Sequence, residues 1–338
     1  MAHRLALAVA VLLALAATAL ASGGFTPDTV DMAAAKKEGT VTWYTSTPIA
    51  TAQKIANLFQ QETGIRVELF RSGGSAVLRR FMQEIDARRV VADVMTISDP
   101  AAAGALIKRD LLVPFRPRHF DKVPDTAKDP NGLHVAQRLN LVGIIVRTDK
   151  VPDPPRTWTD LTDPKWKGKL VMPDPSFTAI QLMVVGALSQ KYGWDFYRKL
   201  RANDTMIVQS HQQVSETLTR GERVVAAEGA DNYAWEARQA GHKVQTVFPS
   251  DGAFTIPAPT MVIKGSARPN AAKALAEFMI SDTVQKLFPG EGIYAARVDV
   301  PPPPGSPPLA SITLMPIDYA YVDREARNLK ARFNEIFQ

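Results

Sequence analysis

Strand and helix patterns alternate over residues 39–113, and this alternation constrains the fold more than any other feature of the sequence. Runs rich in β-branched and aromatic residues, such as Val41–Tyr44, are typical of strands. Each run is followed by a segment with one apolar face, which predicts a helix. The β-α-β-α-β-α order predicts a parallel sheet covered by helices on both faces. The expected strands are 41–44, 65–70 and 90–97, and the expected helices are 49–63, 76–88 and 100–108.

The middle of the chain predicts a second lobe. With 338 residues the chain is long enough for about two domains. The apolar, β-rich segment Val135–Arg147 suits a strand that crosses between lobes. A second set of elements follows, and the strands at 244–248 and 254–263 are expected to return to the first lobe. Further strands are expected at 169–172 and 223–228, and helices at 179–192, 194–202, 213–220, 270–278, 281–287 and from Ile317 onward.

The first residues have the layout of a secretory signal peptide. Arg4 precedes the apolar run Leu5–Leu20, and small residues at Ala19 and Ala21 form a cleavage site. We therefore expect residues 1–21 to be removed and the mature protein to begin near Ser22. The chain has no Cys, so a lipid anchor on a cysteine, a disulfide and a thiolate metal site are not expected.

The net charge and the sequence motifs limit the classes of function that this chain can have. The formal net charge is +6, which indicates either an anionic partner or simply a basic exported protein. Lys and Arg are scattered rather than clustered, so nucleic-acid binding is not expected. The zinc-hydrolase H-E-x-x-H motif, the G-x-S-x-G nucleophile elbow and the nucleotide phosphate loop are all absent from the sequence. An exported enzyme is thus a weak alternative, no cofactor is expected, and a ligand-binding module of a membrane sensor remains open.

An ordered set of segments resembles the periplasmic solute-binding proteins of extracellular family 1, in the branch that includes ferric-ion-binding proteins. The segments include Gly39–Tyr44, Phe59–Val67, Trp158–Leu161 with Trp166–Lys169, and Gly292-Ile293-Tyr294. The resemblance implies a type II binding-protein fold: two α/β lobes, joined by strands that cross twice, that close on a small solute. It also implies a non-catalytic partner of the membrane permease of an ABC importer. From the signal layout we expect the mature protein to be monomeric and periplasmic. The expected lobes are 22–112 with 251–300, and 113–250 with 301–338.

The resemblance also implies positions for ferric ligands. The family's His falls near Pro48, its Glu falls near Ser98 with Asp99 adjacent, and its Tyr pair falls on Tyr233 and Ala234. A variant pattern would use Tyr44. Since Fe³⁺ prefers several anionic oxygens, ferric binding through Tyr233 with a synergistic anion is the second hypothesis.

Four loops before helices favour an anion instead, such as a phosphonate, a phosphate ester or a carboxylate. Glycines, hydroxyls and helix N-termini suit anion binding, although Ser, Thr and Asp at these positions are also ordinary helix caps. Glu228 and Asp231 could accept a hydrogen bond from a ligand amine or hydroxyl, unless they are solvated loop residues. The candidate ligand-binding residues are Thr45, Ser46, Thr47, Arg71, Ser72, Gly73, Gly74, Ser75, Ser98, Asp99, Ser176, Thr178, Ser210, His211 and Tyr233.

Overall fold

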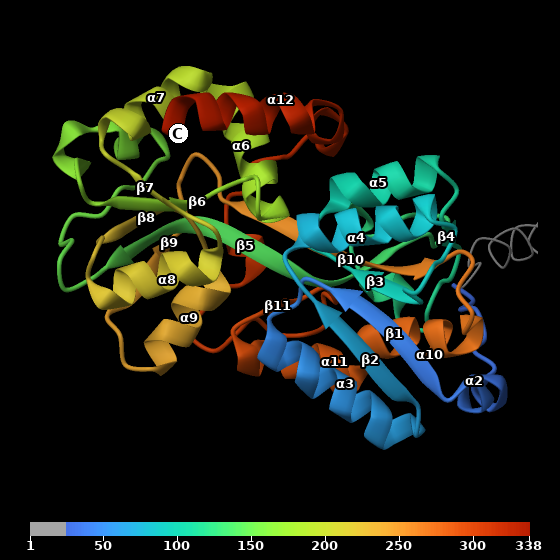
Figure 1. Ribbon diagram of the computed structural model, residues 1–338. Coiled ribbons are helices and arrows are strands. Elements are labelled where there is room, and N and C mark those ends of the chain that lie inside the picture. Colours follow the sequence, from blue (N-terminus) through green and yellow to red (C-terminus); the bar gives the residue numbers. More distant parts are fainter. Residues whose placement is uncertain (1–24) are drawn as a thin grey trace, which may run out of the picture.

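The computed structural model describes residues 25–338, so the expected signal peptide at 1–21 lies outside the described residues. The strands in this range are β1 (Thr40–Thr45), β2 (Arg66–Arg71), β3 (Val94–Thr96), β4 (Leu112–Val113), β5 (Val135–Arg147), β6 (Leu170–Pro173), β7 (Met206–Val208), β8 (Val225–Ala230), β9 (Val244–Val247), β10 (Phe254–Ile263) and β11 (Tyr294–Ala295). They form one mixed sheet in the order β2-β1-β3-β10-β5-β8-β6-β7, with β4, β9 and β11 pairing at its sides. The sheet runs through two lobes (Figure 1).

Helices flank the sheet in both lobes. They are α2 (Met32–Glu38), α3 (Ile49–Thr63), α4 (Gly74–Asp86), α5 (Pro100–Lys108), α6 (Ala179–Tyr192), α7 (Trp194–Ala202), α8 (His211–Arg220), α9 (Asp231–Gln239), α10 (Pro269–Met279), α11 (Asp282–Leu287) and α12 (Tyr319–Phe337). We call β1–β4, β10, α2–α5, α10 and α11 the first lobe, and β6–β9, α6–α9 and α12 the second lobe. Among residues 25–338, no helix combines the length and apolarity needed to cross a membrane.

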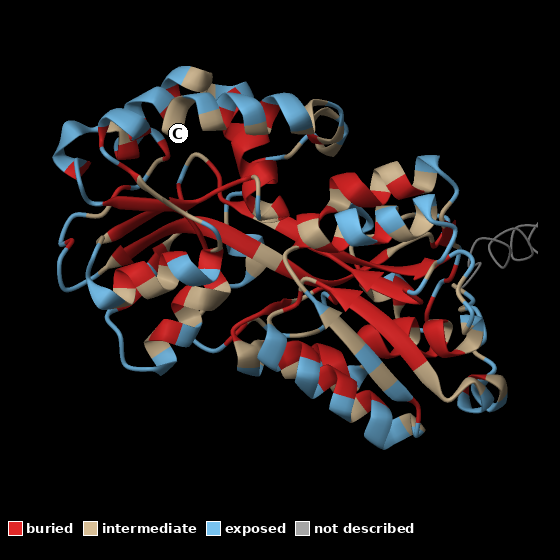
Figure 2. Cartoon of the chain, in the orientation of Figure 1, coloured by how far each residue is buried: buried red, intermediate tan, exposed pale blue. Residues whose placement is uncertain are grey.

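The first lobe has a core on each face of its parallel strands. On one face, Trp43 of β1 packs in a buried cluster with Phe59 of α3 and Phe278 of α10. On the other face, Tyr44 packs in a cluster with Phe81 of α4. Consecutive residues of β1 therefore point into different cores, as expected for a parallel strand that is covered on both sides. Figure 2 shows the central strands as buried and the outer helix surfaces as exposed.

The second lobe repeats this arrangement. Met172 of β6 belongs to a buried cluster with residues of α6, α7 and α12, whereas the neighbouring Val171 packs with residues of α8 and α9. Strand β6 pairs in parallel with β7 and β8. The carboxyl ends of parallel strands from both lobes therefore provide loops that can face one another across a cleft.

Strand β5 belongs to both lobes. Its first part, from Val135 to Val142, pairs with β10, and its last part pairs with β8 and β9. The predicted crossing strand at 135–147 is confirmed. Strand β10 returns to the first lobe as predicted, but β9 does not: it pairs with Ile144–Arg147 in the second lobe. Strands β9 and β10 lie one after the other along the same edge of β5, so only their junction crosses between lobes.

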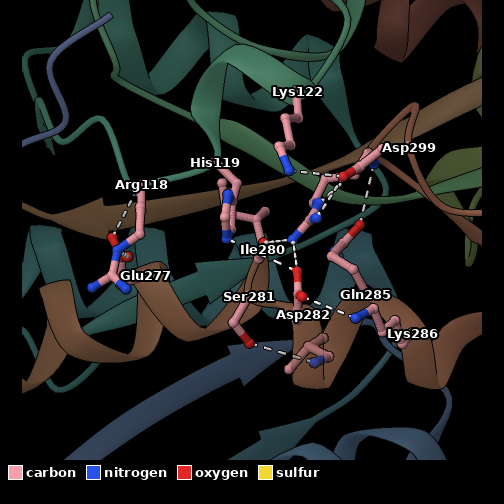
Figure 3. A network of polar contacts seen from close by, with 12 residues as sticks. Arg118, His119, Lys122, Glu277, Ile280, Ser281, Asp282, Gln285, Lys286 and Asp299 are labelled. Atoms are coloured by element: carbon pink, nitrogen blue, oxygen red, sulfur yellow. Dashed lines mark hydrogen bonds and ion pairs between the residues drawn. The ribbon is translucent and has the colours of Figure 1, made fainter.

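A buried arginine near the end of the first lobe forms ion pairs with two carboxylates. Arg297 is 4% exposed, and its guanidinium binds Asp282 at 2.7 Å and Asp299 at 2.8 Å. Figure 3 shows both carboxylates, with Lys122 also directed at Asp299. Two carboxylates thus compensate this buried cation. Hydrogen bonds from Lys286 and Arg297 lower the pKa of Asp282 to about 2.

The lobes touch on both sides of the cleft. Lys108 of α5 lies 3.5 Å from Asp323 of α12, and the ring of Trp235 in α9 lies so close to Gly292 that a β-carbon there would stand 2.6 Å from it. The two lobes are therefore in direct contact at both places. The lobe boundaries expected from the sequence stay a prediction; Phe115, just beyond the first of them, packs with Trp43 in the first lobe.

Candidate ligand-binding cleft

A cavity of about 270 Å³ lies between the lobes. Its walls are the loops that follow β1, β2 and β3 in the first lobe and β6, β7 and β8 in the second. Strand β5 forms its floor. Gly73 from one lobe approaches Phe177 of the other, since a β-carbon on Gly73 would stand 3.0 Å from the Phe177 carbonyl oxygen. The cavity is therefore a cleft between lobes, with its mouth narrowed by backbone contact.

Arg138 on β5 is the main cation of the cavity. It is 2% exposed, and its guanidinium donates to Thr47 Oγ1 at 2.8 Å, Gln137 Oε1 at 3.0 Å and Ser98 Oγ at 3.0 Å. All of these acceptors are neutral, and no carboxylate among residues 25–338 forms an ion pair with it. Burial lowers the pKa of Arg138 to about 10, so the side chain remains charged at neutral pH.

Arg71 and Tyr233 extend the cationic region towards the second lobe. Arg71 Nε donates to the Thr47 carbonyl at 3.0 Å. Burial raises the pKa of Tyr233, while Arg71 and Arg138 act in the opposite direction. The phenol of Tyr233 is neutral at pH 7 and can donate one hydrogen bond. Both residues line the cavity, together with Arg79 of α4.

A hydroxyl network orients the first-lobe wall. Ser98 donates its backbone N–H to Ser46 Oγ at 3.0 Å. Ser98 Oγ accepts from Arg138 and also from Asn140 Nδ2 at 3.1 Å. Asn140 is in turn held by the Ile256 carbonyl at 2.8 Å. These groups are preorganised around the arginine, which reduces the entropy cost of binding an anion there.

The second-lobe wall carries buried polar atoms that lack partners. His211, at the first position of α8, is 5% exposed, and neither ring nitrogen has a hydrogen-bond partner among the described residues. Burial lowers its pKa to about 3, so the imidazole is neutral. Asp231, at the first position of α9, also lines the cavity, and its Oδ2 has no hydrogen-bond partner within residues 25–338. Buried groups without partners are costly, and a ligand in the cavity could satisfy them.

The cavity collects many of the residues expected from the sequence. Those that line it are Ser46, Arg71, Ser72, Gly73, Gly74, Ser98, Thr178, Ser210, His211 and Tyr233. Ser210 also caps α8, because its Oγ accepts from the Gln213 N–H at 3.2 Å. Capping and lining are thus not exclusive roles at this position.

Five other expected residues do not line the cavity. Thr45 Oγ1 donates to the Thr96 carbonyl at 3.0 Å. Thr47 Oγ1 accepts a hydrogen bond from Arg138 at 2.8 Å and so helps to hold that side chain in place. Asp99 caps α5 by accepting from the Ala102 N–H at 2.9 Å. Ser75 is buried in the first turn of α4, and the Ser176 N–H donates to Asp174 Oδ1 at 2.7 Å.

The oxygen donors considered for iron are dispersed. Tyr44 is 1% exposed in the first-lobe core, where its hydroxyl donates to Glu84 Oε1 at 2.5 Å. Burial and this carboxylate raise its pKa to about 12. Asp99 is turned into a helix cap, so only Tyr233 lines the cavity. In the part of the chain that the structure describes, no group of three or more His, Cys, Asp or Glu side chains could hold a metal ion.

Sequence reasoning missed Arg138 and Asn140. Both lie in β5, which the apolar composition of residues 135–147 predicts only as a strand that crosses between lobes. The signal was present: Gln137, Arg138 and Asn140 interrupt an otherwise apolar run. Polar side chains in a fully buried strand need partners, and here they face the cavity or support its wall.

Two α/β lobes, a shared crossing strand and a polar cleft between them define a two-lobed solute-binding protein. The fold of AfuA from Actinobacillus pleuropneumoniae, with exogenous fructose-6-phosphate bound, is similar: the TM-score is 0.80 at 21% identity over 89% of this chain and 99% of the other. Iron-bound HitA from Pseudomonas aeruginosa gives a TM-score of 0.78 at 21% identity over 88% and 99%. The two-lobed type II fold predicted from the sequence is confirmed.

The sequence comparison identifies the family. The model of the bacterial extracellular solute-binding proteins matches residues 90–323, and the chain belongs to this family. One relative, from Salmonella typhimurium, is 25% identical over 67% of this chain and 68% of its own length. Its name describes a proposed 2-aminoethylphosphonate-binding periplasmic protein. The resemblance drawn from the sequence is therefore confirmed at the level of the family.

Proposed function

We propose that this protein captures a small anionic solute in the periplasm and delivers it to the permease of an ABC importer. The observation that carries the proposal is Arg138, a buried cation in the ligand cavity that has only neutral partners. Arg297, which is equally buried, is compensated by Asp282 and Asp299. A buried charge without a counter-charge is costly, and an anionic ligand would supply the missing one.

The surrounding donors favour an anion with several oxygens, such as a phosphonate, a phosphate ester or a carboxylate. Arg138, Arg71 and Tyr233 can donate from the floor and one side, while Ser46 and Ser72 offer hydroxyls. The names of two similar proteins, which refer to fructose-6-phosphate and 2-aminoethylphosphonate, support the same ligand class. A ferric site finds less support, because only Tyr233 of the expected donors lines the cavity.

The family supports the non-catalytic role, the periplasmic location and the permease partner of this proposal. Its members are transport binding proteins, which supports a non-catalytic role here. Cleavage of residues 1–21, release into the periplasm without a lipid anchor, docking to a permease and a monomeric state remain parts of the proposal. No cofactor is required for this role.

Substitution of Arg138 tests the proposal. We expect Arg138→Gln to weaken the binding of ethylphosphonate or of a sugar phosphate by roughly tenfold or more, because a hydrogen bond to a charged group contributes about 1.5–3 kcal/mol. Arg147→Gln is the matched control, since Arg147 lies on the same strand but pairs with Asp149 outside the cavity. Isothermal titration calorimetry measures both.

Two outcomes would contradict the proposal. One is binding of a neutral sugar with no binding of any anion in a panel of phosphonates, phosphate esters and carboxylates. The other is a strong visible charge-transfer band on adding ferric citrate that Tyr233→Phe abolishes, which would indicate a ferric-binding protein.

A further inference from the structure

One wall of the cavity is acidic. Asp231 follows β8 directly, is 3% exposed and lines the cavity. Thr246 Oγ1 donates to its Oδ1 at 2.5 Å, whereas Oδ2 has no hydrogen-bond partner among residues 25–338. The N-terminal end of α9 favours a negative charge there, but it leaves Oδ2 unpaired. A carboxylate oxygen of this kind is a vacant acceptor buried in the wall of the cavity.

The acidic wall is separate from the cationic floor. Ala230 pairs with Val142 of β5, so Asp231 lies beside Leu141, three residues beyond Arg138 on that strand. Three residues of strand span about 10 Å. Among the described residues, Asp231 and Arg138 form no ion pair with each other or with any other side chain. The cavity thus holds a carboxylate that forms no ion pair with Arg138 or with the other lining arginines, Arg71 and Arg79.

We infer that the cleft takes a small zwitterion, whose anionic group pairs with Arg138 and whose primary ammonium pairs with Asp231. This inference rests on the proposed function and adds the second charge of the ligand. A hydroxyl could donate to Oδ2 but would leave the buried carboxylate without an ion pair, whereas an ammonium supplies both the donor and the charge. Burial raises the pKa of Asp231, while the hydrogen bond from Thr246 and the charge of Arg238 act in the opposite direction.

The test compares ligands that differ only at the amine. The pairs are 2-aminoethylphosphonate with ethylphosphonate, phosphoethanolamine with ethyl phosphate, and 4-aminobutyrate with butyrate; 2-hydroxyethylphosphonate is the hydroxyl analogue. We expect the amine to improve affinity at least about tenfold in one or more pairs. In Asp231→Asn that advantage should disappear, while the affinity for the ligand without the amine stays the same or rises. Titration calorimetry of the folded full-length mature protein gives both numbers.

Glu236→Gln is the matched control, because Glu236 is exposed on the same helix and does not line the cavity. It should keep the amine preference. The inference fails alone if ethylphosphonate, ethyl phosphate or butyrate binds as tightly as its amino partner. It also fails if the hydroxyl analogue matches the amine, or if Asp231→Asn retains the preference. If no anion binds, the proposed function fails with it.

Discussion

Glu228 is a buried acid whose surroundings favour its neutral form. It is fully buried on β8, where it accepts from the Tyr197 hydroxyl at 3.1 Å and from the Gln181 amide. Burial raises its pKa from 4.5 to about 7. No cation pairs with it among the described residues. The folded protein therefore binds this proton more tightly than the unfolded chain does.

The consequence for stability has a definite sign. Because the folded pKa is raised, the contribution of Glu228 is fully present below pH 4.5 and is lost as pH rises through about 7. We expect Glu228→Gln to be more stable than the wild type at pH 8, by up to about 3 kcal/mol, and closer to it at pH 4.5. In the described part of the chain Gln181 Oε1 has no hydrogen-bond partner, so the Gln181 amide can turn to accept from the new amide.

Chemical denaturation at several pH values measures this difference. The wild type alone is not sufficient, because His211 titrates in the opposite sense: its folded pKa of about 3 costs stability as pH falls from 6.5. A constant difference between the wild type and Glu228→Gln from pH 4.5 to 8 would contradict the assignment of a neutral acid to Glu228.

At the level of elements, β5 and β9 are packed too closely for a side chain at Gly143. A β-carbon there would stand 2.7 Å from the Val247 carbonyl oxygen, which is backbone and cannot swing aside. We expect Gly143→Ala to destabilise the fold by about 1–3 kcal/mol, as overpacking usually does. Thermal or urea unfolding measures the loss.

Gly104 provides the comparison. It lies inside α5, and a β-carbon there would meet nothing within 4 Å. Gly104→Ala should therefore stabilise the protein by about 0.5–1 kcal/mol, because alanine favours the helix. Equal effects of the two substitutions would show that β5 and β9 can separate without cost.

The sequence predicted elements with strong periodicity well and weaker ones poorly. Strand β10 occupies the expected residues 254–263, since its run is apolar and bounded by turns. Helix α9 is not predicted from the sequence, because Ala230 supplies no side-chain cap and the residues around Asp231 have the composition of a loop. The pairing of β9 depends on which edge of β5 is free, a tertiary property that local pattern does not contain.

The candidate site was predictable only in part. Loops after parallel strands could be placed at the cleft, because strand direction fixes where those loops lie. Which residue of each loop turns inward was not predictable. Asp99 and Ser98 are adjacent, yet one caps a helix and the other faces the cavity. That choice depends on local backbone angles.

At the level of the whole molecule, closure depends on contacts away from the ligand. Trp235 packs against Gly292 across the lobes, and its Nε1 donates to the Pro304 carbonyl at 3.1 Å. Trp235 does not line the cavity. Since apparent affinity falls with the population of the competent form, we expect Trp235→Ala to weaken ethylphosphonate binding by roughly three- to tenfold.

Calorimetry and small-angle scattering check this expectation together. The variant should show a larger radius of gyration at a subsaturating ligand concentration, and Trp235→Phe should restore part of the affinity. An unchanged dissociation constant in Trp235→Ala would show that this contact does not stabilise the closed form.

The position of Arg138 on a strand shared by both lobes separates capture from retention. A strand shared by both lobes moves least when the lobes rotate, so the Arg138 guanidinium keeps its position whether the lobes are open or closed. Charge attraction then governs the association rate, while the lobe contacts govern how long the solute stays. Substitutions at Arg138 should therefore lower the association rate constant, and those at Trp235 should raise the dissociation rate constant. A permease could release the solute by separating the lobes without moving Arg138.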